Sequence, residues 1–161
     1  MLRNAIVIIC LAVLTACAST SGSDIHIGDI SKRTLIADYP KFSATYVDKR
    51  LTDKQTVQLF SWPEGLRIDV FFGTWCHDSQ REVPKFLKAI EKRPIVAYQL
   101  IGLDYNKTEP TGRAAAANVK FTPTFVVYVN NEEIGRIVER TNKGFIEDIT
   151  AMVKQHEKEN S

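Results

Sequence analysis

Residues 66–92 change their hydrophobic period at Gly73, and this change constrains the fold more than any other stretch of the chain. Residues 66–72 form a largely apolar run with β-branched and aromatic side chains, which predicts a buried strand. Beyond Gly73, apolar residues recur at the i, i+3, i+4, i+7 spacing of one helical face: Val83, Phe86, Leu87 and Ile90. A core strand is therefore expected to lead directly into a helix that begins near Ser79.

Cys76 lies at the junction between this predicted strand and helix. The free N–H groups and the positive dipole end of a helix stabilise an anion. For a thiol that anion is the thiolate, which is the nucleophilic form. Cys76 is therefore a candidate nucleophile, and the alternative is a small buried apolar side chain, as free cysteines often are.

Three motifs around this junction resemble those of one protein family. Residues 75–79, Trp-Cys-His-Asp-Ser, resemble the Trp-Cys-x-x-Cys motif of the thioredoxin superfamily, with Ser79 in place of the second cysteine. Pro84, eight residues beyond Cys76, matches the proline that kinks the active-site helix of that family. Residues 122–125, Thr-Pro-Thr-Phe, resemble the family's cis-proline signature, which precedes a core strand and lies against the catalytic sulfur.

The remaining segments, interpreted from their patterns alone, predict the same fold class. A short helix is expected over 31–38, and the further elements are a strand over 42–47, a helix over 52–60, a strand over 95–103, a helix over 112–118, strands over 125–129 and 134–140, and a C-terminal helix from Phe145 that ends in a polar tail at 155–161. With the central strand and helix, the order predicts an α/β, thioredoxin-like fold: a central mixed sheet with helices on both faces. The family resemblance covers roughly residues 42–153.

The resemblance also implies roles for residues beside Cys76. Trp75 and His77 flank it in the motif, and a protonated His77 would favour the thiolate. Thr122 and Pro123 would lie against the sulfur, where their backbone can pair with a substrate strand by β-augmentation. The alternative for this pair is a trans-proline at a strand edge.

Two positions depart from the family pattern. In two-cysteine relatives the second thiol attacks the mixed disulfide, which the hydroxyl of Ser79 cannot do. Ser79 can instead donate a hydrogen bond to the Cys76 thiolate or cap a free N–H at the helix start. Release of the substrate then requires an external thiol: glutathione, another protein, or a second thiol of the substrate. Val70 stands where many thioredoxins carry a buried acid, and the adjacent Asp69 is expected on the opposite face of the strand.

The N-terminal residues predict export and lipid anchoring. A basic start at residues 1–4 and an apolar run over 5–13 are typical of a secretory signal peptide and are too short to span a bilayer. Residues 14–17, Leu-Thr-Ala-Cys, resemble the bacterial lipobox, which implies cleavage before Cys17 and lipidation of its sulfur. The alternative is an ordinary signal peptide with a cysteine near its cleavage site.

The predicted organisation has three parts: a lipoprotein signal peptide over 1–16, the lipidated Cys17 with a flexible tether over 17–30, and a thioredoxin-like domain over 31–161. Cys10 is expected to leave with the signal peptide. Cys76 then remains as the lone thiol of the mature protein and cannot form an intramolecular bridge. The expected location is the bacterial cell envelope, with the domain facing the periplasm or the exterior.

Composition narrows the functional hypotheses. The net charge is only +2, and basic residues are scattered among acidic ones, so no nucleic-acid partner is expected. No cofactor or metal is expected, because Cys76 has no second cysteine or histidine cluster near it in the sequence. The first hypothesis is thiol-disulfide oxidoreductase or isomerase activity through Cys76 on proteins that carry disulfides or thiols. The rival is a non-catalytic peptide-binding or protein-binding module, and a third hypothesis is a peroxide-reactive thiol.

Overall fold

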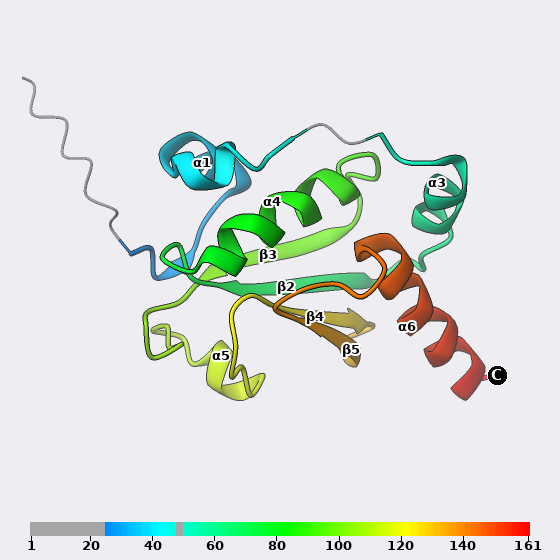
Figure 1. Cartoon of the computed structure of the whole chain (residues 1–161). Helices are drawn as coiled ribbons and strands as arrows, with labels where there is room; N and C mark the ends of the chain where they lie inside the picture. The colour runs from blue at the N-terminus through cyan, green and yellow to red at the C-terminus, as the bar shows by residue number, and fades with distance from the viewer. Residues whose placement is uncertain (1–24, 48–49) are drawn as a thin grey trace, which may run out of the picture.

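The computed structural model describes residues 25–47 and 50–161, and the predicted signal peptide and the lipidation site at Cys17 lie outside these residues. The described residues form one five-stranded sheet in the order β1-β3-β2-β4-β5, with helices packed on it (Figure 1). In chain order the elements are β1 (Gly28–Asp29), α1 (Lys32–Asp38), α2 (Pro40–Ser43), α3 (Asp53–Phe60), β2 (Leu66–Phe72), α4 (His77–Ile90), β3 (Ala97–Gly102), α5 (Arg113–Ala116), β4 (Thr124–Val129), β5 (Glu132–Val138) and α6 (Phe145–Glu159). None of the helices in this described part is long and apolar enough to span a bilayer.

The sheet is mixed, and β2 lies at its centre. β2 pairs with β3 in parallel and with β4 in antiparallel orientation, while β4 and β5 form an antiparallel hairpin. The hairpin turn has Asn130 and Asn131 at φ angles of 51° and 69°. Asparagine tolerates this left-handed conformation, which two-residue hairpin turns of the favoured hand require. The predicted α/β, thioredoxin-like fold with a mixed central sheet is confirmed.

Side-chain alternation along β2 builds a separate core on each face of the sheet. Val70 is fully buried in the larger core, which α1, α2, α3, α4 and α6 cover. Phe71, one residue further, is buried in the smaller core beside Ile101 and Ala114 of α5. In Figure 1, α4 and α5 accordingly lie on opposite sides of the sheet. A strand buried on both faces favours apolar residues on both of them, which explains the largely apolar run in the sequence.

The helices predicted over 31–38 and 52–60 are present as α1 and α3. Ser31 caps α1 by accepting a hydrogen bond from the N–H of Thr34 at 3.0 Å. Thr52 and Gln55 form a complete capping box at the start of α3, as their spacing predicts.

The strand expected over 42–47 is wrong, because this part of the chain forms the short helix α2 and a turn. Pro40 occupies the first turn of α2, where its fixed φ suits a helix. Phe42 is fully buried and packs edge-on against Phe72, with ring centroids 5.6 Å apart. The alternating pattern of this segment reflects one buried ring and not a strand.

Two expected boundaries are also wrong. The folded part starts before residue 31, since β1 pairs with β3 and places Gly28 opposite Gly102. This pairing uses backbone groups only, so it leaves no hydrophobic pattern in the sequence of the expected tether. At the other end α6 continues to Glu159 and includes most of the expected polar tail.

Candidate active site

Cys76 occupies the N-cap position of α4, four residues after the end of β2. Its backbone is extended, with φ −85° and ψ 123°, and its N–H donates to the carbonyl oxygen of Gly73 at 3.0 Å. The turn from Gly73 to Cys76 therefore directs the chain from the strand into the helix. The thiol is half-buried at the helix N-terminus, where N–H groups without helical partners favour an anion.

The segment before β4 lies against this thiol. Cys76 Sγ donates to the carbonyl oxygen of Thr122 at 3.2 Å, although the two residues are 46 positions apart. The peptide bond between Thr122 and Pro123 is cis. Both residues are buried, so the predicted contact between the Thr122–Pro123 loop and the cysteine is present.

Ser79 does not contact the sulfur in the way its place in the motif suggests. It is fully buried, and its Oγ accepts a hydrogen bond from the N–H of Gly73 at 3.2 Å. Within the described part of the chain, no hydrogen bond joins Ser79 to Cys76. The expected bond to the sulfur is therefore not made, and neither is the expected cap on the helix itself. Ser79 instead fixes the turn that carries Cys76.

The indole of Trp75 packs against the segment that follows β3. Its Nε1–H donates to the carbonyl oxygen of Leu103 at 3.0 Å, and its ring packs on Tyr105 with centroids 4.8 Å apart. A Cβ on Gly73 would lie 2.6 Å from the indole, so only glycine leaves room for this orientation. Tyr105 is 62% exposed beside the site.

Sequence reasoning missed Tyr105 as a site residue. Its position in the sequence could have indicated this role, because Tyr105 follows the strand predicted over 95–103. Parallel β2 and β3 bring their carboxyl ends to the same edge of the sheet, where Cys76 also lies.

His77 and Asp78 complete the motif on the outside of the helix start. His77 is exposed, and its ring has no hydrogen-bond partner among the residues described. The carboxylate of Asp78 pairs with Arg81 one turn along α4 at 2.7 Å. The negative charge nearest to Cys76 in the sequence is therefore already paired with a cation.

The interior below the site carries no acid at the position typical of thioredoxins. Val70 fills that position in the larger core. Asp69 lies on the opposite face, as alternation predicts, and its carboxylate pairs with Arg67, whose guanidinium lies over the ring of Tyr128. The only described cysteine is Cys76, with a free thiol, and no cluster of three or more His, Cys, Asp or Glu side chains in the described residues could hold a metal ion.

The N-terminal segment reaches the site, which sequence reasoning did not anticipate. The N–H of His26 donates to Thr74 Oγ1 at 3.1 Å, and the carbonyl of His26 approaches Gly102 so closely that a Cβ there would lie 2.4 Å from it. His26 belongs to the expected flexible tether over 17–30, but its backbone supports the loop before Cys76.

A cysteine at a strand-to-helix junction, covered by a cis-proline loop of a mixed sheet, defines a thioredoxin-like site. The comparisons agree with this class. The chain is 30% identical over 86 residues to "Thioredoxin-like protein R548" of Acanthamoeba polyphaga mimivirus, and the match spans 53% of this chain and 61% of that protein. No family model matches the chain.

Two solved structures share the fold at 18% identity. A Pseudomonas aeruginosa protein of unknown function has a TM-score of 0.53, with 77% of this chain and 84% of that chain covered. An HIV epitope-scaffold has a TM-score of 0.52, with 76% and 84% covered. The chain therefore has a thioredoxin-like fold and is similar in sequence to a thioredoxin-like protein.

Proposed function

We propose that the protein is an exported, membrane-anchored thiol-disulfide oxidoreductase or isomerase that works through Cys76 and an external resolving thiol. The observation that carries this proposal is the half-exposed Cys76 thiol at the N-cap of α4, 3.2 Å from the Thr122 carbonyl. Partial exposure lets a substrate sulfur approach, and the helix N-terminus stabilises a thiolate. The buried Ser79 occupies the position where two-cysteine relatives carry the resolving cysteine, so an external thiol is necessary.

The reaction begins with attack of the Cys76 thiolate on one sulfur of a substrate disulfide. A bond forms between Cys76 Sγ and that sulfur, the substrate S–S bond breaks, and the other substrate sulfur leaves as a thiolate that takes a proton from water. In reduction, an external thiol such as glutathione attacks Cys76 Sγ and releases the substrate as a thiol. A second external thiol then frees Cys76 and leaves the external pair oxidised, so two electrons pass to the substrate.

In isomerisation the substrate supplies the resolving thiol. A second cysteine of the substrate attacks the substrate sulfur of the mixed disulfide, forms a new substrate disulfide and releases Cys76 unchanged. No electrons are transferred overall. A single-cysteine site suits this cycle, because it has no internal thiol that could release the substrate before rearrangement.

Export and anchoring are proposed from the basic, apolar and lipobox-like segments that end at Cys17. In a bacterial host, the wild-type protein is expected to incorporate radiolabelled palmitate and to sediment with membranes. Cys17→Ser should remove the label, since the sulfur is the proposed site of lipid attachment. Equal labelling of the variant would reject the anchor while leaving the proposal for Cys76 untouched.

The proposed chemistry is tested by trapping the mixed disulfide. Purified full-length protein in neutral detergent is mixed with a peptide whose one cysteine is blocked as a disulfide with 2-mercaptoethanol. Mass spectrometry without reductant should locate the adduct at Cys76, and glutathione should release it. Cys76→Ser should fold normally by circular dichroism and form no adduct at this position. Failure of the wild-type protein to form the adduct would contradict the proposal.

The binding-module alternative is favoured by one observation. The Cys76 thiol donates its hydrogen to Thr122, and Val70, not an acid, fills the interior position below the site, so no buried acid accepts that proton. Under this alternative, peptides bind equally well to the wild-type protein and to Cys76→Ser, and neither forms an adduct.

A further inference from the structure

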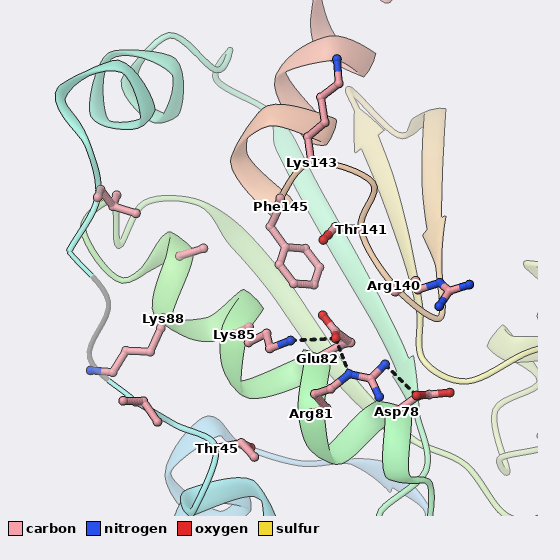
Figure 2. A pocket seen from close by; sticks show the side chains of 14 residues that line it. Thr45, Asp78, Arg81, Glu82, Lys85, Lys88, Arg140, Thr141, Lys143 and Phe145 are labelled. Atoms are coloured by element: carbon pink, nitrogen blue, oxygen red, sulfur yellow. Dashed lines mark hydrogen bonds and ion pairs between the residues drawn. The ribbon is translucent and has the colours of Figure 1, made fainter.

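A groove of about 870 Å³ runs beside the candidate active site (Figure 2). One face of α4, from Asp78 to Ala89, forms its base, and residues 140–145, which connect β5 to α6, line one side. Figure 2 shows the ring of Phe145 pointing from the start of α6 toward α4. The groove begins only two residues beyond Cys76, so a substrate bound at the sulfur can continue into it.

The acidic residues of the groove are already paired with cations. The Asp78 carboxylate binds Arg81 at 2.7 Å. The buried Glu82 carboxylate binds Arg81 at 2.7 Å and Lys85 at 2.9 Å, as the dashed lines in Figure 2 show. Their negative charge therefore opposes an incoming anion only weakly.

Positive charge remains in excess. The lining contains five cationic and two acidic side chains, and Lys88 pairs with Glu91, which lies outside the lining. Arg140 and Lys143 are both exposed on the 140–145 side. Neither side chain has an ion pair or hydrogen bond with any residue that the structure describes. In Figure 2 both side chains extend outward from the rim of the groove, away from α4. Two cations without an ion pair among the described residues thus stand at this rim, near a candidate nucleophile, where they favour an anionic partner.

We propose that this groove binds an acidic, extended segment of the polypeptide whose sulfur reacts with Cys76. The inference rests on the proposed thiol-disulfide chemistry and names the substrate class. Asp78 and Ala89 are eleven residues apart on α4, or about 16 Å, which is the length of about five extended residues. Acidic side chains of the segment pair with Arg140 and Lys143, and an apolar side chain packs on Phe145.

Binding is tested first without any covalent step. Full-length Cys76→Ser protein in neutral detergent is titrated with ten-residue peptides that carry a neutral fluorophore, a central methylated cysteine and four flanking Glu, Gln or Lys residues. Fluorescence anisotropy should show at least tenfold tighter binding of the Glu peptide, decreasing as salt is raised. Arg140→Glu with Lys143→Glu should reduce this binding at least tenfold. The matched reversal of two exposed lysines of α6, Lys154→Glu with Lys158→Glu, should change it less than twofold.

A rate measurement separates this inference from the proposed function. Otherwise wild-type protein reacts with the same peptides, now blocked as 2-mercaptoethanol disulfides, and adduct formation at Cys76 is timed. The Glu peptide should react at least tenfold faster than the Lys peptide, and the Arg140 and Lys143 reversal should remove the difference. Equal rates for all three peptides overturn the inference and leave the chemistry standing. Selective binding of the Glu peptide without any adduct rejects the chemistry and supports a binding module with this specificity.

Discussion

The sulfur of Cys76 lies 3.2 Å from the carbonyl oxygen of Thr122, and this contact depends on the pairing of two central strands. β2 and β4 run antiparallel, and their register places Phe71 opposite Thr124. The end of β2 and the start of β4 therefore lie side by side, with the nucleophile after one and the cis-proline loop before the other. Any change that shifts this register would separate the two halves of the candidate site.

Ser79→Cys should convert the site into one with two thiols. The new sulfur would stand in the first turn of α4, three residues after Cys76, and should form a disulfide with it on mild oxidation. Peptide mapping without reductant should detect the bond, and a disulfide reductase assay should show turnover that does not depend on added glutathione. Absence of the bond would contradict the helix-start geometry.

Ser79→Ala is the matched control for that variant. It removes the hydrogen bond to the buried N–H of Gly73 and adds no thiol. Leaving this N–H unsatisfied should cost about 1–3 kcal/mol in the free energy of unfolding. Urea denaturation measures the loss, and no new disulfide should form.

Gly73→Ala should displace Trp75. Since the added Cβ would lie 2.6 Å from the indole, the ring must leave its bond to Leu103 and its contact with Tyr105. We expect a loss of about 1–3 kcal/mol from overpacking, a red-shifted tryptophan emission and slower adduct formation at Cys76.

Gly112→Ala provides the comparison for Gly73→Ala. Gly112 has φ 74° and open space where a Cβ would stand. The substitution should therefore cost stability, by about 1 kcal/mol, without altering tryptophan emission. Unchanged emission in Gly73→Ala would contradict the proposed support of the indole.

Arg93→Met should destabilise the fold far from the candidate site. The guanidinium of Arg93 is buried and donates to the carbonyl oxygens of Leu59 at 2.6 Å and Trp62 at 2.9 Å. Losing two charge-assisted bonds should lower the free energy of unfolding by about 2–4 kcal/mol in urea denaturation. Arg33→Met, on the exposed face of α1, should change it by less than about 0.5 kcal/mol. Equal effects of the two variants would contradict this role of Arg93.

Glu91 should contribute to stability in a pH-dependent way. Hydrogen bonds from Lys32, Lys88 and Tyr46 lower the pKa of its carboxyl from 4.5 to about 2. A depressed folded-state pKa stabilises the fold above the unfolded value, and this contribution is lost as the pH falls from about 5 to about 2. The side chain is 41% exposed, so we expect no more than about 1 kcal/mol.

Glu91→Gln tests this dependence by urea denaturation across that pH range. The difference in unfolding free energy from the wild-type protein should be largest above pH 5 and should vanish near pH 2. Glu157→Gln, an exposed position on α6, should leave the profile unchanged. A difference for Glu91→Gln that stays constant with pH would contradict the assignment.

The local elements were predictable where a short stretch of sequence carries the whole signal. The capping box at Thr52 and the Asn130-Asn131 turn each depend on neighbouring residues only. The strand prediction over 42–47 failed because a four-residue helix has too few positions to show a helical period. β1 was missed because a two-residue pairing through backbone groups places no demand on side chains.

The sequence by itself determined the thioredoxin-like class and the place of Cys76, since a strand-to-helix change of period and a consecutive motif are local properties. Tertiary structure decided what surrounds the sulfur. The bond from Cys76 to Thr122, the contact of Trp75 with Tyr105, and the place of Arg140 and Lys143 at the rim of the groove along α4 depend on which strands are neighbours and how loops pack. Such contacts join residues distant in the chain, and burial and hydrogen-bond geometry select them only once the sheet has formed.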